Sequence, residues 1–71
     1  MNAKISFKRD GDRYIVWWGD DRIGFVSQMD DKRWNAVDTT MEHSTYRHTR
    51  AEAGDALLRL FKRQIASGVI A

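Results

Sequence analysis

Residues 5–18 read ISFKRDGDRYIVWW, and Asp10-Gly11 separates two segments rich in strand-forming side chains. Asp-Gly is a strong hairpin signal, because both residues tolerate the positive φ angles of a type I′ turn. Asp20-Asp21 and Asp30-Asp31 recur at the same spacing, and aspartate is favoured in turns. The three turns predict an antiparallel sheet over about residues 3–38.

Two-residue loops at the three turns determine which side chains share a face of the sheet. The resulting cross-strand pairs are Phe7 with Tyr14, Trp18 with Ile23, and Phe25 with Ala36. Because side chains alternate along a strand, one face is then nearly all apolar and is the expected core. Its members are Ala3, Ile5, Phe7, Tyr14, Val16, Trp18, Ile23, Phe25, Ser27, Trp34 and Ala36.

The opposite face collects basic side chains. Its members are Lys4, Ser6, Lys8, Arg13, Ile15, Trp17, Arg22, Gly24, Val26, Gln28, Arg33, Asn35 and Val37. Five of these residues are basic and none is acidic, whereas six of the ten acids lie at the turns. The formal net charge of +2 therefore hides a basic face between acidic loop tips.

The C-terminal part of the chain predicts one helix over about residues 50–66. Thr49 is the expected N-cap, because its hydroxyl can accept the amide of Glu52 and the Glu52 side chain can reach back. An apolar stripe at helical spacing follows, and Gly68 suits the end of the helix. The stripe comprises Ala53, Ala56, Leu57, Leu60, Phe61 and Ile65. It is expected to pack on the apolar sheet face, since neither element can bury its apolar side alone.

Residues 1–71 are expected to form one small α+β domain, with an antiparallel sheet of three to five strands packed against one C-terminal helix. Residues 39–48 hold either a short strand at about 44–48 or a plain loop. Asp55 and Arg59 can form an i,i+4 ion pair on the exposed side of the helix.

Several functional classes find no support in the sequence. The lack of cysteine fits a reducing cytoplasm, and no apolar run has the length of a membrane span or the form of a signal peptide. His43 and His48 do not have a familiar metal-ligand spacing. No glycine-rich phosphate loop or nucleophile motif is present. We therefore expect a cytoplasmic, non-enzymatic protein without metal or cofactor.

Trp17 has two interpretations. Trp17 and Trp18 are neighbours in a strand, so Trp18 fits the core while Trp17 lies on the basic face, opposite Lys4 and diagonal to Arg22. An indole there can stack on a base or on a guanidinium plane, or it can simply cover Val26 and stabilise the sheet. With Ile15, Val26 and Val37 it also forms an apolar strip that suits a protein partner or a dimer.

Three stretches occur in a familiar order. They are Ile23-Gly24-Phe25-Val26, Arg33-Trp34-Asn35-Ala36 and Tyr46-Arg47-His48-Thr49-Arg50-Ala51-Glu52-Ala53. Over about residues 22–61 this order resembles the three-stranded-sheet-plus-helix DNA-binding domains, such as the arm-site-binding domain of phage-type tyrosine integrases and the plant ethylene-response-factor domain. In those families the sheet enters the major groove, so the resemblance implies DNA contacts by Arg22, Gln28, Arg33 and Asn35.

This chain departs from those families in an added N-terminal hairpin and in the acidic Asp30-Asp31 turn, which would repel phosphates. We also expect no integrase catalytic domain to follow it. A free-standing domain of this kind resembles a small phage-encoded protein.

Two functions remain open. The first is a module that binds double-stranded DNA through Lys4, Lys8, Arg13, Trp17, Arg22, Gln28, Arg33 and Asn35. The lysines and Arg13 would contact phosphates, the other arginines would read guanine, and the amides would read adenine. The second is a phage-type inhibitor or adaptor that binds a host protein around Trp17. In either case we expect a monomer or a weak dimer.

Overall fold

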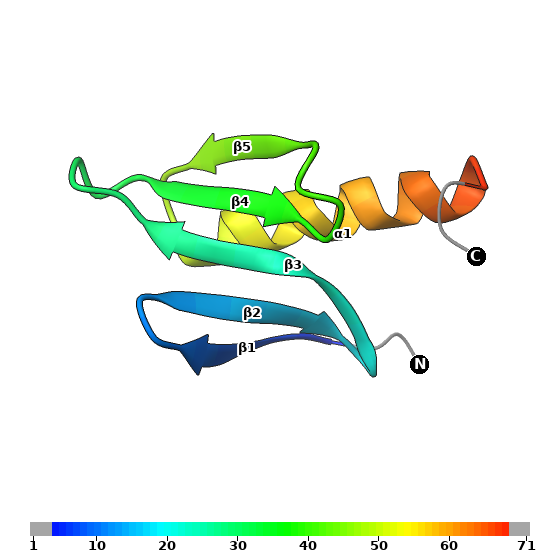
Figure 1. Ribbon diagram of the computed structural model, residues 1–71, viewed down its shortest axis with the longest axis horizontal. Coiled ribbons are helices and arrows are strands. Elements are labelled where there is room, and N and C mark those ends of the chain that lie inside the picture. Colours follow the sequence, from blue (N-terminus) through cyan, green and yellow to red (C-terminus); the bar gives the residue numbers. More distant parts are fainter. Residues whose placement is uncertain (1–3, 69–71) are drawn as a thin grey trace.

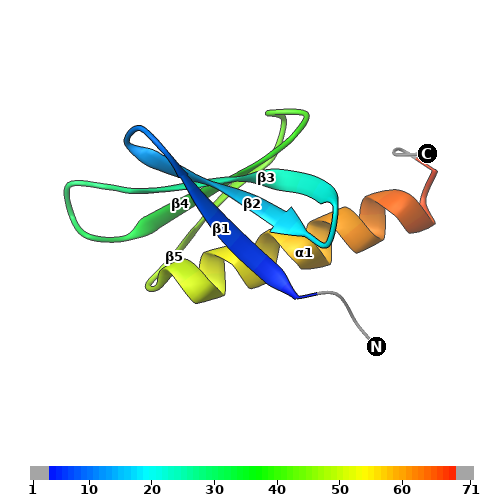
Figure 2. The same cartoon turned by 90° about the horizontal axis from the view of Figure 1, so that it is seen from below.

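The computed structural model describes residues 4–68, which form one antiparallel sheet in the order β1-β2-β3-β4-β5 and one helix (Figure 1). The elements are β1 (Ile5–Asp10), β2 (Arg13–Trp18), β3 (Asp21–Gln28), β4 (Trp34–Asp38), β5 (Ser44–Arg47) and α1 (Arg50–Ala66). Turned on its side, the molecule shows two layers, with α1 along one face of the sheet (Figure 2). The predicted α+β class is confirmed, while Ala3 lies outside the described residues.

The core lies between the sheet and α1. The sheet contributes Val16, Ile23, Val26 and Ala36, and α1 contributes Ala53, Leu57 and Phe61. The ring of Trp18 meets the ring of Phe61 edge to face, with 6.0 Å between their centroids. Neither layer could keep these apolar side chains from water without the other, and their burial is the main stabilising contribution to the fold.

The first hairpin keeps the predicted faces but changes its register. Its loop is Gly11-Asp12, with Gly11 at a φ of 64°, so Asp10 pairs with Arg13. Phe7 consequently lies opposite Val16 rather than Tyr14. Because this shift spans two residues, every side chain of the hairpin stays on the face that the alternation predicts.

A β-bulge places the second half of β3 on the face opposite to the one predicted. Trp17 pairs with Arg22 while Val16 pairs with Gly24, which leaves Ile23 as the extra residue. Beyond the bulge Gly24, Val26 and Gln28 face α1, and Phe25 and Ser27 face away from it, so the predicted faces of these residues were wrong. A one-residue slip has this effect because side chains alternate.

The bulge brings β3 close to its neighbours at Gly24. The glycine has a φ of 151°, and an added Cβ would collide with the carbonyl oxygen of Val37 and lie 3.0 Å from the Cδ2 atom of Leu57. Glycine is therefore required where the backbone of β3 approaches both β4 and α1.

The third turn is longer than predicted and offsets the bulge. It spans residues 29–33, and the amide of Met29 donates to the carbonyl of Arg33 at 2.7 Å. The register shifts by one residue again, so Val26 rather than Phe25 lies opposite Ala36. The second shift returns Trp34 and Ala36 to the predicted core face.

Of the two alternatives for residues 39–48, the structure shows the strand, since β5 pairs with β4.

The helix also begins and ends as predicted. The Thr49 hydroxyl accepts the amide of Glu52 at 3.1 Å and donates to the Glu52 carboxylate at 3.0 Å. Gly68, at a φ of 82°, follows the last turn of α1. Local capping chemistry was therefore a reliable guide to the bounds of the helix.

The buried side of α1 is rotated relative to the predicted stripe. Gly54 and Gln64 are buried, whereas Ile65 is 44% exposed. Gln64 is buried because it donates a hydrogen bond to a carboxylate of the sheet. Within residues 4–68, no ion pair joins Asp55 to Arg59, which the spacing would allow.

Candidate nucleic-acid interface

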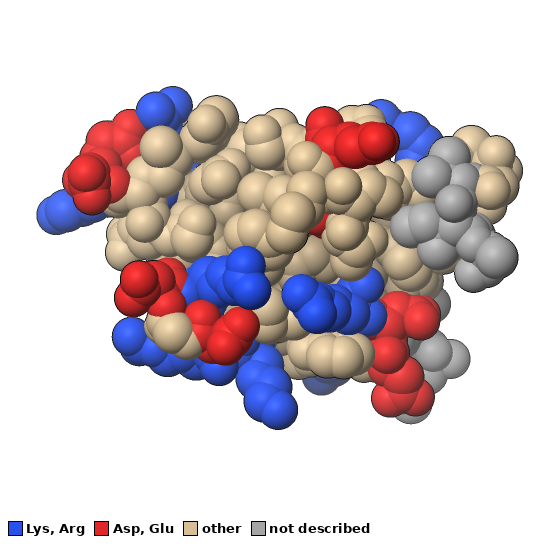
Figure 3. Space-filling view, viewed as in Figure 1, with Lys and Arg blue, Asp and Glu red and all other residues tan. Residues whose placement is uncertain are grey.

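The sheet face turned away from α1, which we call the outer face, carries most of the predicted site. By register and alternation it comprises Lys4, Ser6, Lys8, Arg13, Ile15, Trp17, Arg22, Phe25, Ser27, Asn35, Val37, Ser44 and Tyr46. Figure 3 shows this face, with a broad uncharged centre, basic side chains across its lower half and acidic side chains toward its margins. The charge separation expected from the turns is therefore present in three dimensions.

A hollow of about 320 Å³ lies in the basic half of the outer face. It is lined by Lys8, Arg9, Asp10, Arg13, Ile15, Trp17 and Arg22. Ile15 is only 9% exposed although no helix covers this face, because its neighbours on the outer face surround it. The hollow thus contains apolar side chains that are surrounded by basic ones.

Trp17 has different neighbours from those predicted. It lies opposite Ser6 on β1, rather than Lys4, and directly opposite Arg22 on β3. It does not cover Val26, which faces α1 after the bulge. The prediction that Trp17 packs over Val26 is therefore wrong. The partly buried indole lines the hollow instead.

The guanidinium of Arg13 lies over an aromatic ring at the side of the hollow. Its guanidinium carbon is 4.4 Å from the ring centroid of Phe25, and its Nε atom is 3.5 Å from the carboxylate of Asp10. Both side chains of this ion pair are well exposed, so it contributes little to stability. The ring contact restricts the planar guanidinium, which stays partly exposed at the surface.

Asn35 lies in the other half of the outer face, and Arg33 borders that half. Arg33 lies in the turn before β4, where its Nε atom is 2.6 Å from the carboxylate of Asp31 and its guanidinium is 5.0 Å from the centroid of Tyr46. The backbone amide of Arg33, and then its guanidinium, hold the pKa of Asp31 below its ordinary value. The charge of Arg33 is therefore compensated by Asp31.

Asn35 lies between Ser27 and Tyr46 on the neighbouring strands. Its Oδ1 atom is buried and has no hydrogen-bond partner within the described part of the chain.

Gln28 does not belong to the outer face. It lies opposite Trp34 on the side of the sheet that faces α1, and its Nε2 atom donates to the carbonyl of Lys32 at 3.4 Å. The bulge moved it there, so its predicted place beside Arg22 and Asn35 was wrong. Lys4 is exposed just before β1, at the margin of the outer face.

Two aromatic residues of the outer face were missed by sequence reasoning. Phe25 was assigned to the core because the bulge was not recognised, although a glycine inside a strand, here Gly24, is a known signal for one. Tyr46 is not predicted there because the sequence does not decide between a strand and a loop for residues 39–48. Alternation along Ser44–Arg47 would have placed it beside Asn35 once the strand was accepted.

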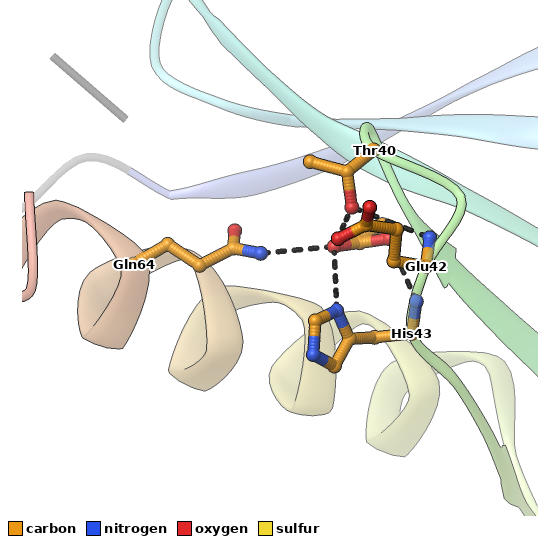
Figure 4. A network of polar contacts seen from close by, with 5 residues as sticks. Thr40, Glu42, His43 and Gln64 are labelled. Carbon is orange, nitrogen blue, oxygen red and sulfur yellow. Dashed lines mark hydrogen bonds and ion pairs between the residues drawn. The ribbon is translucent and has the colours of Figure 1, made fainter. Parts of the chain in front are cut away.

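A second polar cluster lies between the β4–β5 connection and α1 (Figure 4). Gln64 of α1 and the side chains of Thr40 and His43 converge on the carboxylate of Asp38, which is 2% exposed. Burial raises the pKa of Asp38, but hydrogen bonds from Thr40, Gln64 and His43 outweigh it and leave the pKa below its ordinary value. This cluster joins the β4–β5 hairpin to α1.

Within residues 4–68, no group of three or more His, Cys, Asp or Glu side chains is placed to hold a metal ion. The helix of this part of the chain lacks the length and apolar character that crossing a membrane requires. Comparison of the chain with protein-family models, with curated proteins and with solved structures finds no match.

Proposed function

We propose that this domain binds double-stranded DNA through its outer face. The observation that carries the proposal is the hollow in which Lys8, Arg13 and Arg22 surround Trp17 and Ile15. Phosphate contacts supply affinity, and basic side chains arranged around one hollow can reach several phosphates of one backbone. A pair of antiparallel strands has the width to enter the major groove, where arginine reads guanine.

The distribution of acids limits how DNA can approach. Acidic pairs stand at the turns, whereas within the hollow's lining Asp10 is the sole acid and it already pairs with Arg13. Phosphates are therefore repelled from the ends of the hairpins and attracted to the middle of β1, β2 and β3. This charge pattern favours one orientation of the sheet on the duplex.

The aromatic residues support the basic ones. Phe25 and Tyr46 lie under the guanidinium groups of Arg13 and Arg33, which are thereby restricted before any ligand arrives. A preordered side chain loses less conformational entropy on binding. Trp17 offers an indole that can pack against a sugar or a base edge.

A matched pair of variants tests the site. Lys8→Gln/Arg22→Gln removes two charges from the hollow, whereas Arg59→Gln/Arg63→Gln removes two charges from α1 on the other layer. The first variant should weaken binding to a mixed-sequence duplex at least tenfold at low salt, and the second should change it less than threefold. Equal losses in the two variants would refute the assignment of the outer face.

A protein partner is the second candidate, and the apolar content of the same face favours it. Ile15, Trp17, Phe25, Val37 and Tyr46 extend across the sheet, and aromatic residues are enriched at interface hot spots. In that case Trp17→Ala would abolish binding and added salt would matter little. If the partner is a second copy, sedimentation equilibrium would report a dimer, and a monomer mass at high protein concentration would exclude it.

A further inference from the structure

A groove separates β5 from α1 on the side of the sheet opposite the outer face. Its central part has a volume of about 280 Å³. It is lined by Ala36, His43, Ser44, Thr45, Arg47, Ala56, Leu57, Arg59, Leu60 and Arg63. The strand supplies one wall and the helix the other, and alanine and leucine side chains form the apolar part between them. β5 is also an edge strand, so the groove is open to solvent along this side.

The groove is longer than this central part. A hollow of about 130 Å³ continues it toward the start of α1 and shares Arg47, Ala56 and Arg59 in its lining. Another of about 280 Å³ continues it toward the end of α1 and shares His43 and Leu60, together with Arg63, in its lining. Because adjacent hollows share walls, the groove follows the seam between β5 and α1. An extended chain fits this shape better than a compact small molecule.

Three arginines line the centre of the groove. Arg59 and Arg63 are one turn apart on α1, and Arg47 faces them from β5. None of the three has an ion pair within the described part of the chain. The Arg47 guanidinium donates to the Thr45 hydroxyl at 2.5 Å and to the Tyr46 carbonyl at 2.8 Å, which restricts it.

The acids near the groove lie toward its ends. Glu52 and Asp55 line the part near the start of α1, and Glu42 lines the part near its end. Glu52 is already engaged by the Thr49 hydroxyl of the helix cap. Among the residues that line the central part, three are arginines and none is acidic, so positive charge gathers there beside an apolar surface, between acids at the two ends.

We propose that this groove binds an extended acidic peptide segment of a partner protein. Carboxylates of the segment would form paired hydrogen bonds with the arginines, and an apolar side chain between them would cover the partly exposed Ala56 and Leu60. Charge complementarity selects an acidic partner, and the length of the seam selects an extended one. The surface is separate from the outer face, so both can be occupied at once.

Fluorescence anisotropy with a fluorescein-labelled peptide of alternating glutamate and leucine tests this proposal, with the glutamine-leucine peptide as the control ligand. The glutamate peptide should bind the wild-type domain at low salt, and the glutamine peptide at least tenfold more weakly. Arg59→Gln/Arg63→Gln should lose at least tenfold in affinity for the glutamate peptide. Arg22→Gln, which removes a charge from the outer face, should lose less than twofold.

Circular dichroism melts establish that each variant is folded before its affinity is compared. If the double variant does not fold, Arg59→Gln alone carries the test, with an expected loss of at least threefold. The proposal is overturned if the wild-type domain does not bind the glutamate peptide, if both peptides bind equally, or if Arg22→Gln loses as much as the groove variants. DNA affinity of the same variants reports separately on the outer face.

Discussion

The Nε2 atom of Gln64 donates a hydrogen bond of 2.9 Å to the buried Oδ2 atom of Asp38, and so joins the end of β4 to the second half of α1. The Thr40 hydroxyl donates to the same oxygen at 2.7 Å, and the amide of His43 donates to the other carboxylate oxygen at 3.2 Å. A buried carboxylate is costly unless it is well hydrogen-bonded, and here its donors come from both layers of the fold. Asp38 is thus a link between the sheet and the helix.

Loss of the Gln64 bond should destabilise the domain. Gln64→Met keeps the volume of the side chain but leaves the buried Asp38 one donor short, which costs about 1–3 kcal/mol. Urea denaturation at neutral pH measures the change in the free energy of unfolding. Gln28→Met is the control, because Gln28 is exposed and should lose less than about 0.5 kcal/mol. Equal changes in the two variants would show that Asp38 does not need this donor.

Stability should fall in acid because of Asp38. Its pKa in the folded state is below the ordinary value of 3.8, so the folded state binds this proton less readily than the unfolded state. The contribution is fully present above pH 3.8 and is lost as pH falls through the folded-state pKa. Urea denaturation at a series of pH values should show a smaller acid loss for Asp38→Asn than for the wild-type domain. Parallel curves would exclude Asp38 as the cause.

Gly24→Ala should be severely destabilising. The residue has a φ of 151°, and its new Cβ would meet the Val37 backbone as well as Leu57, so neither strain nor collision can be relieved by a side-chain rotation. We expect a loss of about 3 kcal/mol or more in thermal or urea denaturation. Gly11→Ala is the matched control, because it has a φ of 64° but open space around it. The control should lose only about 1–2 kcal/mol, and an equal loss would contradict the collision.

Arg50 should contribute to stability through two aromatic rings. Its guanidinium is 4.8 Å from the ring centroids of both Phe7 and Tyr14, although a cation at the start of a helix opposes the helix dipole. Arg50→Met keeps the apolar part of the side chain and should lower the free energy of unfolding by about 1 kcal/mol. Arg59→Met, which removes a cation from the exposed side of the same helix, should cost less. A stabilising effect of Arg50→Met would mean that the dipole term outweighs the rings.

The sequence was a good guide where the signal was local. The hydroxyl of Thr49 and the carboxylate of Glu52 identify the start of α1, and Gly68 its end, because caps depend on a few adjacent residues. The strands β1 and β2 also kept their predicted faces, so Lys8, Arg13 and Trp17 share the outer face as expected.

The sequence was a poor guide in β3. Gly24, Phe25 and Val26 offer no alternation of apolar and polar side chains, so hydrophobic periodicity does not reveal the one-residue bulge, and Gly24 inside the strand is the one local signal for it. The turn at residues 29–33 is longer than predicted and shifts the register by one residue again. The two shifts cancel, so the side chains of β4 lie on the predicted faces. Burial of Gln64 depends on Asp38, which is distant in sequence, and no helical periodicity could have predicted it.

The central claim is that the outer face binds duplex DNA, and a salt titration tests it most directly. A mixed-sequence duplex is added to the wild-type domain at low and at moderate salt, and binding is followed by tryptophan fluorescence. We predict micromolar or tighter binding at low salt, with a log-log slope of about −3 if Lys8, Arg13 and Arg22 each contact one phosphate. Absence of binding at low salt, or an affinity that does not change with salt, would contradict the account.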